Sequence, residues 1–236
     1  MPGKGVLYLI PTSIADETTD RVIPDQVTET IKPLRYFLAE DIRTARRYLS
    51  SLKIFPVIEE LQFNVLDKNT HVATLPGLLA PLMHGINVGV LSESGCPGVA
   101  DPGSLAVAYA HQHNIRVVPL VGPSSILLAL MASGLNGQRF AFQGYLPVDG
   151  TECRRAIKAF ELESRTKSQT QIFIETPYRN NAVFANLLKS LQDETRLCVA
   201  VDITGKEESI KTLPVKTWKK LANSWPKLPA VFLFLA

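Results

Sequence analysis

Short apolar runs alternate with amphipathic or longer apolar segments along most of this chain. The short runs predict β-strands at residues 6–10, 35–39, 87–91, 115–120, 140–145, 171–175, 197–202 and 230–235. The segments between them predict α-helices at residues 42–52, 75–84, 104–113, 125–133, 152–163, 179–191 and 217–222. Strands that alternate with helices are typical of α/β proteins, in which helices cover the faces of a sheet. We therefore expect an α/β fold with a parallel sheet in at least the first half of the chain.

A group of structure-breaking residues divides the chain near its middle. Pro119, Gly122 and Pro123 follow one predicted strand and precede a predicted helix. With 236 residues, the chain is long enough for one large or two small domains. We expect an N-terminal α/β domain over residues 1–120 with a mostly parallel sheet, and a C-terminal α/β domain over residues 121–236 with a mixed sheet.

The composition, 46% hydrophobic and 20% charged with a net charge of +3, is that of a globular protein. That charge is too small by itself to indicate a nucleic acid or membrane partner. No apolar segment approaches the roughly 20 residues that span a bilayer, and the N-terminal residues lead directly into a strand. We therefore expect neither a membrane span nor a signal peptide. Three scattered cysteines without C-x-x-C spacing favour a reducing, cytoplasmic location.

Several common cofactor and catalytic motifs are absent from the sequence. The histidines have no partner at zinc-ligand spacing, so we expect no metal site. The glycines do not form G-x-G-x-x-G, a Walker A loop or a G-x-S-x-G elbow. The sequence therefore disfavours dinucleotide binding, triphosphate binding and serine hydrolysis of the usual kind.

The loop at residues 92–103, Ser-Glu-Ser-Gly-Cys-Pro-Gly-Val-Ala-Asp-Pro-Gly, is the most informative segment. It follows a buried strand, and ligands of open α/β sheets bind beyond the carboxyl ends of strands. It contains Glu93 and Asp101 but no lysine or arginine, so it suits a neutral or cationic ligand better than a phosphate. Asp101 is also a favourable helix N-cap before Pro102, and capping and ligand binding both stay open.

Two further segments combine acidic and basic side chains. Glu40 and Asp41 follow a predicted strand, and Glu175-Thr176-Pro177-Tyr178-Arg179 follows another. The predicted helix at 42–52 carries basic residues that form either a solvated face or a phosphate-contacting patch. These basic residues and the one after the helix are Arg43, Arg46, Arg47 and Lys53.

Taken in order, these motifs resemble the tetrapyrrole methylase superfamily, and within it the bacterial 16S rRNA cytidine 2′-O-methyltransferase branch. The resemblance covers nearly the whole chain. Its segments are Pro11-Thr12-x-Ile14, Ala39-Glu40-Asp41-x-Arg43-Thr44, Ser92-x-x-Gly95-x-Pro97-x-x-x-Asp101-Pro102-Gly103, Ile115-Arg116-Val117-Val118-Pro119-Leu120-Val121-Gly122-Pro123-Ser124, Gly134-Leu135, Arg139-Phe140, Gly144-Tyr145-Leu146-Pro147 and Glu175-Thr176-Pro177-Tyr178-Arg179.

The resemblance implies two α/β domains of the tetrapyrrole methylase type with S-adenosylmethionine in a cleft between them, in a homodimer. It implies methyl transfer to an RNA ribose 2′-hydroxyl, with rRNA as substrate and partner. The cofactor contacts implied by the match are Pro11, Ser92, Gly95, Cys96, Pro97, Val99, Ser124, Ser125, Thr176, Thr204 and Pro229. Asp41 and Glu175 are the candidate general bases, and the substrate-side candidates are Glu40, Arg43, Thr44, Tyr178 and Arg179.

This chain departs from the family pattern at several positions. Ala15-Asp16 replaces Gly-Asn after the first strand, Val201 stands where the pattern has arginine, and Pro229-Ala230 replaces Gly-Glu before the last strand. The chain also stops at the last predicted strand. Cofactor binding should survive these changes. The acceptor stays open between RNA and a small molecule such as a tetrapyrrole, and a cofactor-binding protein without catalysis is a third reading.

Overall fold

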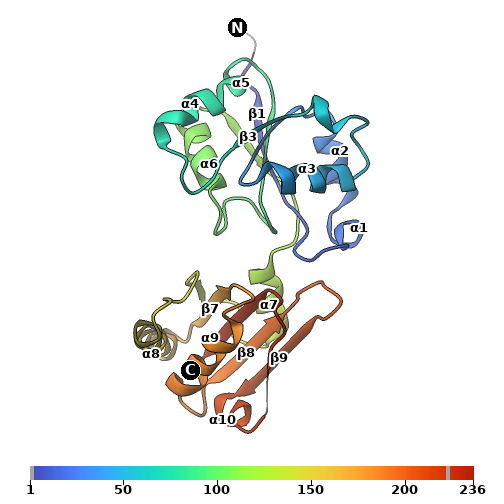
Figure 1. Cartoon of the computed structure of the whole chain (residues 1–236). Helices are drawn as coiled ribbons and strands as arrows, with labels where there is room; N and C mark the ends of the chain where they lie inside the picture. The colour runs from blue at the N-terminus through green and yellow to red at the C-terminus, as the bar shows by residue number, and fades with distance from the viewer. Residues whose placement is uncertain (1–2, 222–223) are drawn as a thin grey trace. The chain divides into compact units, whose positions relative to one another are not determined.

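The computed structural model describes residues 3–221 and 224–236 and divides the chain into two compact units. The N-terminal unit is Met1–Ser124 and the C-terminal unit is Ser125–Ala236 (Figure 1). Each unit has its own sheet covered by helices, which confirms the predicted α/β fold. No helix among the described residues is long and apolar enough to cross a membrane.

The sheet of the N-terminal unit has the strand order β3-β2-β4-β1-β5, and every pairing in it is parallel. Its strands are β1 (Val6–Ile10), β2 (Tyr36–Ala39), β3 (Gln62–Val65), β4 (Val88–Leu91) and β5 (Arg116–Pro119). Because the strands are parallel, their carboxyl ends meet at one edge of the sheet. Glu40 and Ser92 lie at that edge, directly after β2 and β4.

Helices cover this parallel sheet on its two faces (Figure 1). Alternate β1 residues supply the two cores: Leu7 packs with α4 and α6, whereas Ile10 packs with α2 and α3. The α-helices of the unit are α1 (Thr19–Val22), α2 (Asp25–Ile31), α3 (Ile42–Ser51), α4 (Leu75–Leu78), α5 (Ala80–Met83) and α6 (Gly103–Gln112). Two short 3₁₀ turns, Ile58–Glu60 and Val72–Thr74, precede β3 and α4.

The C-terminal unit has a mixed sheet in the order β6-β7-β10-β8-β9. Only β6 and β7 pair in parallel, and the other neighbours are antiparallel. The strands are β6 (Phe140–Phe142), β7 (Thr170–Glu175), β8 (Arg196–Val201), β9 (Ser209–Pro214) and β10 (Ala230–Leu235). The helices are α7 (Ser125–Ser133), α8 (Gly150–Lys167), α9 (Asn180–Ser190) and α10 (Val215–Trp218).

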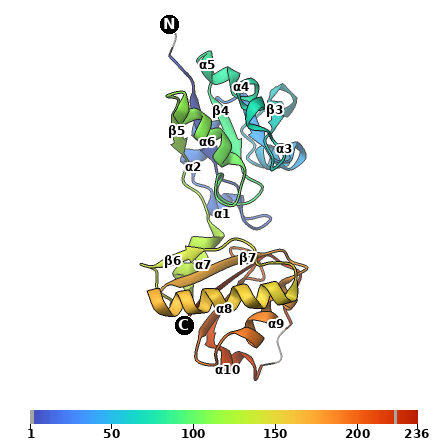
Figure 2. The same cartoon turned by 90° about the vertical axis from the view of Figure 1, so that its left-hand side faces the viewer.

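Alternation along β10 builds the two cores of this unit. Phe232 and its like-facing neighbours pack with α8, α9 and α10, while Val231 and Leu233 pack with α7. Figure 2 shows α8 lying along the sheet. This helix begins where the Asp149 carboxylate accepts the Thr151 and Glu152 N–H groups, each at 2.9 Å.

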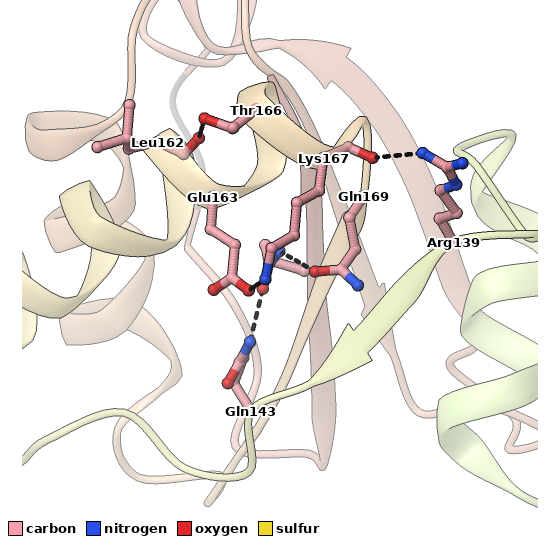
Figure 3. Close-up of polar contacts among 8 residues, drawn as sticks. Arg139, Gln143, Leu162, Glu163, Thr166, Lys167 and Gln169 are labelled. Atoms are coloured by element: carbon pink, nitrogen blue, oxygen red, sulfur yellow. Dashed lines mark hydrogen bonds and ion pairs between the residues drawn. The ribbon is translucent and has the colours of Figure 1, made fainter.

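The end of α8 is tied to the start of the neighbouring strands (Figure 3). Ser168 adopts a left-handed conformation with φ of 50° and ends the helix. Arg139, next to β6, donates to the Lys167 carbonyl at 3.3 Å, and Lys167 pairs with Glu163. Gln143 donates to Gln171 at 2.7 Å. The register between β6 and β7 is set by backbone bonds, in which the Thr170 N–H donates to the Arg139 carbonyl and the Gln143 N–H to the Ile172 carbonyl.

Some predicted elements differ from the structure. The predicted helix at 75–84 is divided into α4 and α5, because Pro76 and Pro81 each begin a new turn. Two strands, β3 and β9, and the helices α1 and α2 were not predicted. The predicted helix at 217–222 is α10 with earlier bounds, and its last residue, Ala222, lies outside the described residues.

Candidate functional site

The carboxyl edge of the parallel sheet gathers three predicted segments. Thr12 follows β1, Glu40 follows β2, and Ser92 follows β4, and these three strands are neighbours in the sheet. In open α/β sheets this edge is where ligands bind. The structure therefore brings together, within the N-terminal unit, residues that the sequence assigned to the cofactor and to the substrate.

The loop after β4 is folded back on this edge by its backbone. Gly95 and Gly98 have φ values of +76° and +81°, which favour glycine, and the Thr12 N–H donates to the Gly95 carbonyl at 2.9 Å. Asp101 accepts the N–H groups of Gly98 at 2.9 Å and Gly103 at 2.7 Å, so its carboxylate closes the loop onto the first residue of α6. The N-cap position of α6 is Pro102 rather than Asp101, because the helix begins one residue later than the capping prediction requires. Its second oxygen, Oδ2, is buried and has no hydrogen-bond partner among the described residues.

The segment after β5 packs directly against the segment after β1. A Cβ on Gly122 would lie 2.1 Å from Cβ of Pro11, so only glycine fits there without movement. The Cys96 thiol lies 3.3 Å from the Pro123 carbonyl, and burial raises the pKa of this thiol. Three predicted cofactor segments, around residues 11, 96 and 123, are thus in mutual contact.

The carboxylates at this edge have pKa values that are shifted in different directions. Burial, followed by the charges of Asp101 and Glu93, raises the pKa of Glu40. Burial also raises the pKa of Glu93, whose Oε1 accepts the Asp41 N–H at 3.2 Å. Asp41 behaves in the opposite way, because the N–H groups of Thr44 and Arg43 bind its carboxylate and lower its pKa. The Asp41 side chain is the N-cap of α3.

One of these carboxylates, Glu93, lines a cavity of about 130 Å³. It lies between the segment after β1, the first turns of α3 and the start of the loop after β4. Its lining residues are Thr12, Ser13, Ile14, Ala15, Asp16, Thr44, Ala45, Arg47, Tyr48, Ser92 and Glu93. Of these, the sequence analysis assigned only Ser92 and Thr44 to a site. Arg47 was visible as part of a basic run, and Thr12 and Ile14 belong to a segment of the family resemblance, but none of the three was assigned a role in a site. Tyr48 was not singled out.

The predicted residues of the C-terminal unit lie at one edge of its own sheet. Glu175 at the end of β7 and Val201 at the end of β8 both pair with Ala230 at the start of β10. Thr176, Thr204 and Pro229 follow or precede these positions. Ser125 is the first residue of α7.

Glu175 and Arg179 form an ion pair inside this unit. Arg179 Nη1 lies 3.2 Å from Glu175 Oε2, and the Glu175 side chain is 1% exposed. Arg179 also donates to the Leu146 and Pro147 carbonyls at 3.3 and 3.0 Å. The pair therefore fixes the loop after β6, which leaves Glu175 little access to an acceptor. Tyr178, by contrast, is 82% exposed.

Thr204 occupies a strained turn between β8 and β9. Its φ is +70°, its N–H donates to Glu208 Oε2 at 2.6 Å, and its buried Oγ1 has no hydrogen-bond partner among the described residues. The Pro229 carbonyl accepts the Asp202 N–H at 2.9 Å, which joins this turn to the start of β10. Within the described residues no three His, Cys, Asp or Glu side chains are arranged to hold a metal ion.

The chain was compared with protein-family models, curated proteins and solved structures. No family model matches the chain. The ribosomal RNA small subunit methyltransferase I of Synechocystis sp. is 32% identical over 206 residues, which cover 86% of this chain and 69% of that protein. The protein of the same name from Escherichia coli O157:H7 is 31% identical, over 90% of this chain and 70% of its own length. This chain belongs to the ribosomal RNA small subunit methyltransferase I family.

The fold of this family member matches solved methyltransferases of other specificity. The uroporphyrin-III-C-methyltransferase of Thermus thermophilus superposes with a TM-score of 0.56 at 16% identity, over 98% of this chain and 92% of that one. The methyltransferase CobJ superposes with a TM-score of 0.61 at 16% identity, over 98% and 93% of the two chains. These similarities confirm the tetrapyrrole methylase type of fold that the sequence motifs implied.

Membership in the ribosomal RNA small subunit methyltransferase I family confirms the resemblance and the methyltransferase class expected from the motifs. The positions at which this member departs from the pattern lie in both units: Ala15 and Asp16 line the cavity, whereas Val201 and Pro229 lie at the edge of the mixed sheet. The individual roles of the site residues stay predictions.

Proposed function

We propose that this protein transfers the methyl group of S-adenosylmethionine to a ribose 2′-hydroxyl of small-subunit rRNA. The observation that carries this proposal is the 32% identity to a ribosomal RNA small subunit methyltransferase I over 86% of the chain. The acidic, glycine-shaped edge of the N-terminal unit supports it independently.

The loop after β4 fits a positively charged cofactor. The carboxylates of Glu93 and Asp101 lie in it without a neighbouring lysine or arginine in the loop, and Asp101 Oδ2 is a buried acceptor without a partner among the described residues. When bound, S-adenosylmethionine supplies a methyl carbon activated by a positively charged sulfur. The residues of the N-terminal unit that would hold it are Pro11, Ser92, Gly95, Cys96, Pro97, Val99 and Ser124, and those of the C-terminal unit are Ser125, Thr176, Thr204 and Pro229.

The protein's own contribution is to align the acceptor hydroxyl, exclude water and accept a proton. Asp41 and Glu175 were predicted from the sequence as the general bases that accept this proton. Asp41 is occupied by capping α3 and has a lowered pKa, and Glu175 is buried against Arg179. Glu40 has a raised pKa and lies at the same edge, so it is the better matched proton acceptor. Asp41 then positions the first turn of α3.

An exposed cation on α3 suits contact with the RNA backbone. Arg43 lies in the first turn of this helix and is exposed. Phosphate contacts of this kind would position the RNA without reading its sequence. The homodimer and the cytoplasmic location stay predictions, and sedimentation of the purified protein would test the former.

Two measurements test the proposed activity. Calorimetry with S-adenosylhomocysteine should show one cofactor-type site per chain. Incubation of the protein and labelled donor with undermethylated small ribosomal subunits should place the label in 2′-O-methylated nucleosides, with fully modified subunits as the matched control.

The outcomes separate the alternatives. Label that appears only in a small-molecule fraction would assign the enzyme to another acceptor, such as a tetrapyrrole. Cofactor binding without any transfer would indicate a binding protein that has lost catalysis. Label in the bases would retain RNA as substrate and overturn the ribose assignment.

A further inference from the structure

The cavity beside β1, β4 and α3 has the size of a single aromatic ring. Its volume is about 130 Å³. An engineered protein cavity of roughly 150 Å³ binds benzene, so the volume is sufficient for one six-membered ring.

The polar groups of this cavity are complementary to one edge of such a ring. Arg47 offers guanidinium donors and Glu93 offers carboxylate acceptors. Glu93 uses Oε1 for the Asp41 N–H, but a carboxylate has about four acceptor positions, so it retains capacity for a ligand donor. Proteins recognise the edge of a nucleobase with hydrogen-bond donors such as arginine and acceptors such as glutamate, and this cavity has one of each.

A buried hydroxyl lines the same cavity without a partner in the described part of the protein. Thr12 is 5% exposed, and its Oγ1 makes no hydrogen bond there. A buried polar atom left without a partner is costly, so native proteins rarely keep one without a reason. The unsatisfied Thr12 hydroxyl is the independent indication that a polar ligand completes this cavity.

The cavity also adjoins the residues assigned to the cofactor. Thr12 follows Pro11, and Ser92 belongs both to the cavity lining and to the predicted cofactor contacts. The cavity lies at the carboxyl edge of the sheet, the edge at which Glu40 follows β2.

We propose that this cavity is the subsite for the acceptor nucleobase and that Glu93 and Arg47 select cytosine. This inference rests on the proposed function. Glu93 accepts from the exocyclic amine of cytosine, and Arg47 donates to the ring nitrogen or carbonyl beside it. Uracil presents a carbonyl where cytosine has the amine, and that oxygen would face the Glu93 carboxylate.

The test compares acceptor bases at one position. The nucleotide methylated by the wild-type protein is first mapped in small-subunit rRNA, and reconstituted subunits are then prepared with cytidine or uridine at that position. The wild-type protein should prefer cytidine by about tenfold or more in kcat/KM. Glu93→Gln should reduce the preference to less than about threefold, because an amide can donate or accept. Glu60→Gln, an exposed carboxylate just before β3, is the matched control.

Two further variants separate recognition from structure. Arg47→Ala should raise KM for the subunit and weaken base discrimination, whereas Arg116→Ala, an exposed arginine at the amino end of β5, should do neither. Thr12→Val should raise KM while leaving the melting temperature equal or higher, since it removes a hydroxyl that lacks a partner in the free protein.

A wild-type preference that Glu93→Gln leaves unchanged would overturn the subsite while leaving the proposed function intact. Methylation of a purine by the wild-type protein would do the same. Absence of any transfer to RNA by the wild-type protein would overturn the two proposals together.

Discussion

The Tyr48 hydroxyl donates to the Pro11 carbonyl at 2.8 Å, in a buried bond that joins α3 to the segment after β1. Burial raises the pKa of Tyr48, so the hydroxyl keeps its proton and remains a donor. The bond holds the Pro11 segment between α3 on one side and Gly122 on the other. This hydrogen bond therefore connects Pro11, a predicted cofactor contact, with Tyr48, which lines the cavity.

Tyr48→Phe removes this donor and leaves the Pro11 carbonyl unsatisfied. We expect a loss of about 1–3 kcal/mol in the free energy of unfolding. The affinity for S-adenosylhomocysteine should fall with it, because the Pro11 segment loses its fixed point. Chemical denaturation and calorimetry measure the two effects. Tyr145→Phe, on an exposed loop residue, should change stability by less than about 0.5 kcal/mol, and an equal loss there would contradict this role.

Glu40→Gln and Asp41→Asn test which carboxylate accepts the proton. Removing a general base costs about 10²–10⁴ in rate, so Glu40→Gln should lower kcat by that factor with little change in cofactor affinity. Asp41→Asn should retain most of kcat, because asparagine caps a helix as well as aspartate does. Single-turnover methyl transfer decides between them, and the reverse result would restore Asp41 as the base.

The raised pKa of Glu40 also predicts a dependence of stability on pH. Its ordinary value is 4.5, and the folded protein raises it, so the folded state binds the proton more tightly than the unfolded state. The favourable contribution is complete below that value and is lost as the pH rises through the folded pKa. Glu40→Gln should therefore raise the melting temperature at pH 7, with the gain shrinking below pH 4.5. Thermal unfolding at the two pH values, with Glu60→Gln as a control for lost charge, tests this.

Gly122→Ala tests the close approach of two loops. The added Cβ would meet Pro11 Cβ at 2.1 Å, so one loop must shift. We expect lower stability and at least tenfold weaker binding of S-adenosylhomocysteine, since both loops carry predicted cofactor contacts. Gly77→Ala in α4 is the matched control, because nothing lies within 4 Å of its Cβ position. Normal cofactor binding by Gly122→Ala would show that the loops tolerate separation.

The strands β1 and β10 were predicted with the observed bounds because each is a buried apolar run. The strands β3 and β9 were not predicted, because exposed polar residues such as Gln62 and Lys211 interrupt their apolar positions. The other two edge strands, β5 and β6, were predicted because each contains an apolar run. The helix α2 buries only Val27 and Ile31, which is too few positions for a periodic signal. The hydrophobic pattern detects runs of apolar residues, and these three elements lack such runs.

Part of the candidate site could also be predicted from the sequence, and part could not. The loop after β4 and the carboxylates after β2 were predicted, because residue types at strand ends can be read directly. The unsatisfied hydroxyl of Thr12 could not be read, since it depends on what packs around one atom. Nor could the sequence show that Asp41 caps α3 or that Glu175 is held by Arg179. Those facts depend on side-chain geometry, and they alter the role that each carboxylate can take.

Arg179→Ala leaves the carboxylate of Glu175 buried without its cation. Breaking a buried pair from one side costs about 3–5 kcal/mol; because Arg179 is partly exposed, we expect about 2–3 kcal/mol, measured by denaturation. The double variant Arg179→Ala/Glu175→Gln should recover part of this loss, because it removes the unpaired charge. Arg196→Ala, whose exposed side chain makes one 3.4 Å bond to the Gly134 carbonyl, should cost less than about 0.5 kcal/mol. If Glu175→Gln alone abolished methyl transfer while stability and cofactor affinity were unchanged, Glu175 would act on the acceptor rather than on the loop after β6.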